Sequence, residues 1–135
     1  MISGLIRNLR AVATAALCVA AASAAQADNY PSRNITLVLP FAAGSGTDTT
    51  TRLISQHLSQ ALGVGIVIEN KAGANGMLAA SYVAKAAPDG YTLLVTTNTT
   101  HSANPYLLKT LTYDPVKDFT PIARTGDLPL SLIHI

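Results

Sequence analysis

One stretch decides the fold: residues 35–62 read ITLVLPFAAGSGTDTTTRLISQHLSQAL. Residues 35–39 form an almost continuous apolar run with β-branched members, which is typical of a strand buried on both faces. A proline ends this run, and a glycine-rich turn follows over residues 41–48. Over residues 48–62 the apolar side chains recur at helical spacing. The stretch therefore predicts a strand, a tight turn and a helix in succession.

Both ends of this helix carry sequence signals. Thr47 or Asp48 is expected as the N-cap, because either side-chain oxygen can accept a free backbone N–H of the first turn. Gly63 is expected just beyond the C-terminus, where a left-handed residue closes many helices. The apolar side of the helix is expected to consist of Leu53, Ile54, Leu58, Ala61 and Leu62.

The same pattern then repeats along the chain. A second apolar strand is expected over residues 64–68, followed by a loop and by a helix of small residues over 77–87. A tight turn at 88–90 leads into a third strand over 91–96. Alternating strands and helices at this spacing predict βαβ units, a parallel sheet and right-handed crossovers. The predicted fold class is therefore α/β.

Beyond residue 97 the pattern is weaker. A short helix is expected over 104–111, and a fourth strand is expected to begin within 120–124. The three earlier strands should supply the most buried residues of the core. These are Leu37, Val38, Leu39, Ile66, Val67, Ile68, Leu93, Leu94 and Val95.

Residues 1–27 are expected to be a secretory signal peptide and not part of the fold. Two arginines precede or flank an apolar stretch at 11–22, and small residues at 25–27 suit a signal peptidase. Such a stretch is short for a lasting membrane anchor, which is the alternative. We expect cleavage before Asp28 and a mature periplasmic chain of residues 28–135.

The single cysteine raises a further alternative, a lipid-anchored protein. Cys18 would be the modified residue, but a small residue should precede it and Leu17 stands there. If the signal peptide is removed, no cysteine remains in the mature chain. An exported protein of this kind has no disulfide and must be stabilised by packing.

Charge and composition argue against several classes of partner. The chain has nine Lys and Arg against seven Asp and Glu, and two of the arginines lie in the expected signal peptide. The mature charge is therefore balanced, and no basic run suggests a nucleic-acid partner. No cluster of His or Cys residues offers a metal site, so we expect neither a metal nor a cofactor.

Two loops are candidates for a ligand site, because open parallel sheets bind ligands outside the carboxyl ends of their strands. The first follows residues 35–39 and opens onto a helix N-terminus, where free N–H groups and the helix dipole favour an anion. An ordinary βα turn that binds nothing is the alternative. Its candidate residues are Phe41, Ala43, Gly44, Ser45, Gly46, Thr47 and Asp48.

The second candidate loop follows the third predicted strand and is rich in hydroxyl and amide groups. Such neutral donors suit carboxylate or carbonyl oxygens, although a solvated loop would have the same composition. Its candidates are Thr97, Asn98, Thr99, Thr100 and His101. A third and weaker loop, residues 71–76, contributes Asn75. Asp48 would repel a bound anion, so its expected role is to cap the helix and fix the first loop.

Enzymatic motifs are incomplete in this region. The run from Gly44 resembles a dinucleotide fingerprint, but Thr49 stands where its third glycine belongs. Ser45 lacks the flanking glycines of a nucleophile elbow, since Ala43 and Thr47 occupy those positions. We therefore expect no enzyme. A secreted α/β enzyme such as a hydrolase, or a dinucleotide-binding module, remains the alternative.

Several blocks along the chain resemble, in order, the substrate-binding receptors of tripartite tricarboxylate transporters, also called the Bug family. They cover nearly all of residues 28–135. The blocks are 30–33 (YPSR), 38–42 (VLPFA), 46–48 (GTD), 68–76 (IENKAGANG), 84–94 (AKAAPDGYTLL), 99–101 (TTH), 104–105 (NP) and 113–123 (YDPVKDFTPIA).

This resemblance implies a two-lobed periplasmic binding protein that closes on a small organic acid, such as a di- or tricarboxylate or an amino acid. Residues 28–135 would be the N-terminal part of its first lobe, with the second lobe absent. The implied partners are membrane transporter subunits, and the receptor is expected to be a monomer. The two candidate loops would hold a ligand carboxylate, partly through water. Ala43 and Ser45 depart from the proline and glycine that are usual in the family, so the ligand preference could differ.

Overall fold

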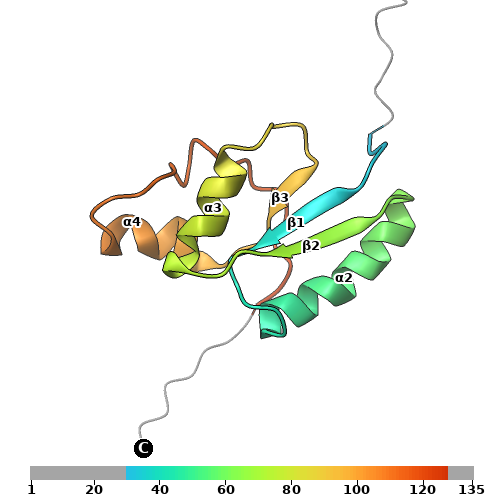
Figure 1. Ribbon diagram of the computed structural model, residues 1–135, viewed down its shortest axis with the longest axis horizontal. Coiled ribbons are helices and arrows are strands. Elements are labelled where there is room, and N and C mark those ends of the chain that lie inside the picture. Colours follow the sequence, from blue (N-terminus) through green and yellow to red (C-terminus); the bar gives the residue numbers. More distant parts are fainter. Residues whose placement is uncertain (1–29, 128–135) are drawn as a thin grey trace, which may run out of the picture. The chain divides into compact units, whose positions relative to one another are not determined.

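The computed structural model describes residues 30–127, and the unit considered below begins at Pro31 (Figure 1). The expected signal peptide, its cleavage site before Asp28 and the last residues of the chain lie outside the described part. The described unit is an α/β structure, which confirms the predicted fold class.

Three parallel strands form the sheet, as predicted. They are β1 (Ile35–Leu39), β2 (Ile66–Asn70) and β3 (Thr92–Leu94), in the spatial order β2-β1-β3. The central β1 pairs with both neighbours in parallel register, so that its middle residue faces a partner on either side. All three strands therefore end at the same edge of the sheet.

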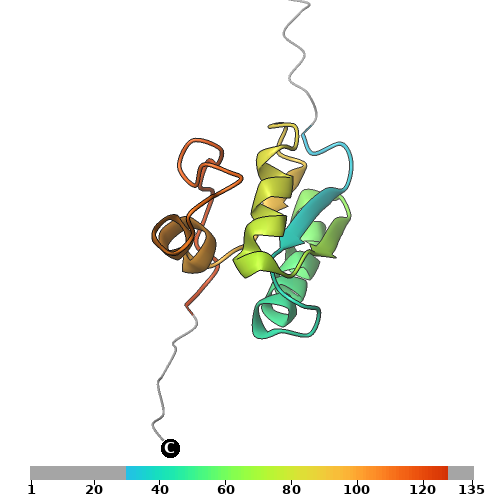
Figure 2. The ribbon, with the colours of Figure 1, turned by 60° about the vertical axis from the view of Figure 1, so that its left-hand side comes forward.

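Two helices connect the strands. Helix α2 (Gly46–Leu62) links β1 to β2 and packs along β2, whereas α3 (Met77–Ala84) links β2 to β3 and contacts β3 and β1. Figures 1 and 2 show the two helices on opposite sides of the sheet. This is the arrangement that βαβ units produce, and it leaves the carboxyl edge of the strands uncovered by either helix.

The N-cap of α2 is Ser45, and neither expected residue takes that place. The Ser45 hydroxyl accepts a hydrogen bond from the Asp48 N–H at 3.2 Å. The helix begins at Gly46, two residues earlier than expected, so the residue before it, Ser45, is the N-cap. The expected C-terminal residue is confirmed, since Gly63 is left-handed (φ 69°) and its N–H donates to the Ser59 carbonyl at 2.9 Å.

The second strand lies two residues later than predicted. Val64 and Gly65 complete the turn out of α2, and Ile35 N–H donates to the Gly65 carbonyl at 3.0 Å. At the other end, polar Asn70 still belongs to the strand and pairs with Leu39. Polar residues continue this strand because the parallel ladder, and not apolar burial, sets its end.

The core is centred on β1. Ile35, Leu37 and Leu39 form the buried cluster, and half-buried apolar residues of the neighbouring strands pack against it. Val38 is also fully buried. The prediction that the three strands supply the most buried residues holds only for Leu37, Val38 and Leu39. Val67 is 46% exposed, and the other predicted core residues are half-buried: Ile66, Ile68, Leu93, Leu94 and Val95. Val67 lies on β2, an edge strand of the described sheet.

After β3 the chain forms a π-helical turn, η2 (Thr99–Ala103), and a short helix, α4 (Asn104–Leu107). The expected helix at 104–111 is therefore present but shorter. Residues 108–127 form neither helix nor strand, so the fourth strand expected within 120–124 is absent. Within residues 30–127, no helix is both long enough and apolar enough to span a membrane.

Candidate functional site

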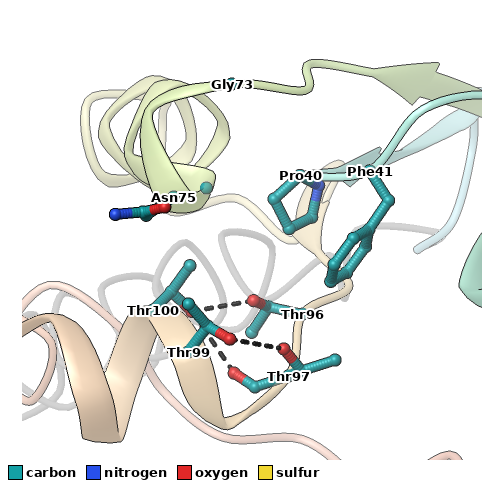
Figure 3. Close-up of a pocket in the computed structure, with 9 residues that line it drawn as sticks. Pro40, Phe41, Gly73, Asn75, Thr96, Thr97, Thr99 and Thr100 are labelled. Carbon is teal, nitrogen blue, oxygen red and sulfur yellow. Dashed lines mark hydrogen bonds between the residues drawn. The ribbon is translucent and has the colours of Figure 1, made fainter. Parts of the chain in front are cut away.

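A hollow of about 260 Å³ lies at the carboxyl ends of β1 and β3. Three loops meet around it: the end of β1, the turn η1 (Ala74–Gly76) before α3, and the segment after β3 (Figure 3). The hollow therefore lies at the edge of the sheet where the sequence predicted a ligand site. The lining residues are Pro40, Phe41, Gly73, Asn75, Gly76, Thr96, Thr97, Thr99 and Thr100.

Gly76 allows these loops to approach one another. It is buried and left-handed (φ 80°), and a Cβ at this position would lie 2.7 Å from Thr100 Cγ2 and 3.0 Å from Pro40 Cβ. Real side chains do not reach such distances without displacing their neighbours. The preceding Ala74 and Asn75 are also left-handed, at φ 48° and 52°. The turn is therefore wound tightly enough to place Asn75 in the hollow.

The buried carboxylate of Asp48 holds the first loop in place through hydrogen bonds. It accepts hydrogen bonds from the Gly44 N–H at 2.8 Å, from Arg52 Nε at 2.9 Å and from Asn70 Nδ2 at 2.9 Å. Asn70 Nδ2 also donates to the Phe41 carbonyl at 3.0 Å. The hydrogen bond from Arg52, followed by those from Gly44 and Asn70, holds the pKa of Asp48 well below its usual range. Asp48 therefore stays charged and fixes the loop, although it is not the N-cap.

Most candidates of the first loop do not line the hollow. Phe41 lines it, whereas Ala43, Gly44, Ser45, Gly46, Thr47 and Asp48 do not. Two N–H groups expected to meet an anion are used inside the loop. Gly44 N–H binds Asp48, and Ser45 N–H donates to the Ala42 carbonyl at 3.2 Å. The loop shapes one wall of the hollow chiefly through Phe41.

The segment after β3 supplies most of the polar surface. Thr96 and Thr100 hydroxyls lie 2.7 Å apart, and those of Thr97 and Thr99 lie 3.4 Å apart (Figure 3). Among the candidates of this segment, Thr97, Thr99 and Thr100 line the hollow, whereas Asn98 is exposed and does not. The structure therefore brings together four threonine hydroxyls at one edge of the sheet.

His101 is placed behind the threonines and does not line the hollow. Its Nδ1 lies 2.8 Å from the Thr100 hydroxyl, and its ring packs edge-on against Phe119 with centroids 4.8 Å apart. Partial burial lowers the pKa of His101. Burial therefore favours the neutral imidazole, and Thr100 and Phe119 contact the ring on two sides.

A buried network of hydrogen bonds holds the segment after β3 in place. The Tyr113 hydroxyl donates to the Thr100 carbonyl at 2.6 Å and accepts from Asn104 Nδ2 at 3.3 Å. Asn104 Nδ2 also donates to the Asn75 carbonyl at 2.9 Å. The network joins two walls of the hollow. Its tyrosine and asparagine were not among the predicted site residues, because only their distant partners reveal their role.

The chemistry available in the hollow is that of neutral donors. None of its lining residues carries a charge, and residues 30–127 contain no group of three His, Cys, Asp or Glu side chains able to hold a metal. Ser45, which was considered as a nucleophile, has its hydroxyl engaged by Asp48 N–H as the helix cap. The arrangement can bind and orient a polar ligand through hydroxyl and amide groups.

The fold is that of an α/β unit with a hollow at the carboxyl ends of its strands, and comparison with known proteins gives its family. The sequence pattern of the tripartite tricarboxylate transporter family receptors matches residues 50–134. The chain belongs to this family. It is 41% identical over 132 residues to a UPF0065 protein of Bordetella bronchiseptica and 36% identical over 113 residues to the BugT protein of Bordetella pertussis.

These alignments include 98% and 83% of this chain but only 39% and 35% of the two relatives. The chain thus spans about two fifths of the length of the curated relatives that it matches.

Solved structures have the same fold over the matched part. MatC from Rhodopseudomonas palustris with bound malate is 52% identical (TM-score 0.65), covering 68% of this chain and 31% of MatC. Another R. palustris protein, with adipate, is 45% identical (TM-score 0.61), covering 64% and 29%. The periplasmic binding protein BugD is 41% identical (TM-score 0.65), covering 69% and 31%. Similarity to parts of larger binding proteins agrees with the predicted partial lobe.

Proposed function

We propose that the protein containing this chain is a periplasmic receptor for a small dicarboxylate, and that this hollow holds one of the ligand's carboxylates. The observation that carries the proposal is the meeting of four threonine hydroxyls with no acidic side chain among the lining residues. Hydrogen bonds from neutral hydroxyls suit a carboxylate and require no proton transfer. Malate and adipate are the ligands of two similar solved proteins.

The nearby acidic groups do not oppose an anion. Asp48 is compensated by Arg52 and by two further hydrogen bonds, so its charge is not directed at the ligand. Glu69, near the end of β2, pairs with Lys71 at 2.7 Å. A carboxylate in the hollow would therefore meet hydroxyl groups and not an unpaired negative charge.

A complete receptor requires a second wall. Residues 28–135 are, in this proposal, the N-terminal part of a first lobe, and a second lobe closes over the ligand and selects the acid. The closed form would then be recognised by membrane transporter subunits. Family membership and the greater length of the relatives support this arrangement. A signal peptide at residues 1–27 and a monomeric receptor complete the proposal.

Calorimetric titration of the mature full-length protein with malate and adipate tests the proposal. Binding should require charge, so the dimethyl esters should not bind. Thr99→Val should weaken binding by about 1.5–3 kcal/mol, the value of a hydrogen bond to a charged group. The control is Thr49→Val, because Thr49 is exposed on α2 and away from the hollow. Equal affinity of acid and ester, or equal effects of the two variants, would contradict the proposal.

A further inference from the structure

The Thr100 hydroxyl lies between two short contacts. It is 2.7 Å from the Thr96 hydroxyl and 2.8 Å from His101 Nδ1, while the Thr97 carbonyl lies farther away, at 3.5 Å. Thr100 is almost completely buried, so water does not replace these partners. A hydroxyl has one proton to donate and can accept two hydrogen bonds. At least one of the two close partners must therefore donate to Thr100.

Three arrangements satisfy both short contacts. In the first, His101 carries its proton on Nδ1 and donates to Thr100, which donates to Thr96, whose own proton is then available to the hollow. In the second, Thr96 donates to Thr100, which donates to an unprotonated Nδ1. Thr96 then presents only lone pairs to the hollow. In the third, Thr96 and His101 Nδ1–H both donate to Thr100, which donates to the Thr97 carbonyl at 3.5 Å. Only the first arrangement leaves the Thr96 proton for a ligand oxygen in the hollow, which Thr96 lines.

We propose that His101 is a positioning residue, whose Nδ1–H directs the Thr100 and Thr96 hydroxyls so that Thr96 donates to the ligand carboxylate. This inference rests on the proposed function, because only an anionic ligand requires the first arrangement. The ring is suited to the role, since Phe119 packs against it and fixes its orientation. Phe119 in turn packs edge-on against Tyr113, with centroids 5.9 Å apart. His101 thereby acts on the ligand without touching it.

Two substitutions separate this role from simple packing. His101→Leu fills similar space but cannot donate, so Thr100 should no longer be directed towards Thr96. The affinity for malate or adipate, whichever binds more tightly, should fall by about tenfold. In His101→Asn the side-chain amide can donate from near the position of Nδ1, and it should restore most of that loss. Equal losses in both variants would overturn the proposal.

A double-mutant cycle tests the route through Thr96. Thr96→Val removes the hydroxyl while keeping the shape of the side chain. If His101 acts through this hydroxyl, His101→Leu should cost about tenfold in the parent and almost nothing in the Thr96→Val background. An equal cost in both backgrounds would show that His101 acts by another route, and the inference would be wrong even though the receptor binds its acid.

NMR of the imidazole nitrogens gives a direct reading on the unaltered full-length protein. Addition of the acid should convert His101 to the form protonated at Nδ1 or leave it there, while exposed His57 on α2 serves as the internal control. An unprotonated Nδ1 in the bound state would overturn the inference. If titration shows no binding of either acid, the proposed function has failed and this inference fails with it.

Discussion

Replacing Gly76 with alanine should be one of the most damaging single-methyl changes in this part of the chain. The residue is left-handed at φ 80°, which costs an L-residue about 1–2 kcal/mol. The new Cβ would also lie 2.7 Å from Thr100 Cγ2 and 3.0 Å from Pro40 Cβ. Overpacking of this kind typically costs about 1–3 kcal/mol. Gly76→Ala should therefore lower the free energy of unfolding by about 2–5 kcal/mol.

Two other glycines separate these contributions. Gly44 is left-handed at φ 82° but a Cβ there would meet nothing within 4 Å, so Gly44→Ala should cost only the backbone part, about 1–2 kcal/mol. Gly46 has open space and no left-handed backbone at the first residue of α2, so alanine should be nearly neutral.

Urea unfolding of the full-length protein, followed by circular dichroism, measures all three variants. Equal destabilisation by Gly76→Ala and Gly44→Ala would refute the argument that Gly76 is required for the close approach of the loops.

Two further predictions concern the groups that hold the loops. Tyr113→Phe should cost about 1–3 kcal/mol in urea unfolding, because it removes the bonds to Thr100 and Asn104, whereas Tyr106→Phe at a 90% exposed site should cost almost nothing. Asp48→Asn should destabilise at neutral pH. Because folding depresses the pKa of Asp48, its stabilisation is complete above the usual value of 3.8 and is lost as the pH falls below it. Below pH 3.8, the difference in the free energy of unfolding between the parent and Asp48→Asn should therefore become smaller. A difference that keeps its full size in acid would contradict this prediction.

Short stretches of the sequence were sufficient to predict the central strand, the end of α2 and the parallel order of the sheet. The apolar, β-branched run at Ile35–Leu39 can be satisfied only by burial on both faces, and it became the central strand. Gly63 closes α2 because a left-handed residue is needed there. The parallel order followed from the alternation of strands and helices, since each connection is long enough for a crossover helix.

The boundaries and the burial of edge positions depended on pairing and could not be read locally. Whether Val67 is covered depends on how many strands lie beside β2, and one apolar residue contains no such information. Helix α2 begins at Gly46, two residues earlier than predicted, so Ser45 is the N-cap in place of Thr47 or Asp48. All three residues have capping side chains and lie within four positions, which offered no basis for choosing between them.

The position of the hollow could be predicted from the sequence, but its lining residues could be predicted only in part. Phe41, Asn75, Thr97, Thr99 and Thr100 line the hollow as expected from loops at strand ends. Pro40, Gly73, Gly76 and Thr96 also line it and were not proposed. Thr96 was assigned to the predicted third strand, which proved to end at Leu94. The role of the two glycines depends on distances between segments that are far apart in the sequence.

The most direct test of the account is a crystal structure of the full-length protein with bound malate or adipate. The account predicts one ligand carboxylate in the hollow, within hydrogen-bonding distance of the Thr97 or Thr99 hydroxyl and close to Phe41. Asp48 should remain bonded to Arg52 and to the Gly44 N–H. A ligand whose carboxylates both lie outside this hollow, with the threonine hydroxyls making no contact to it, would contradict the central claim.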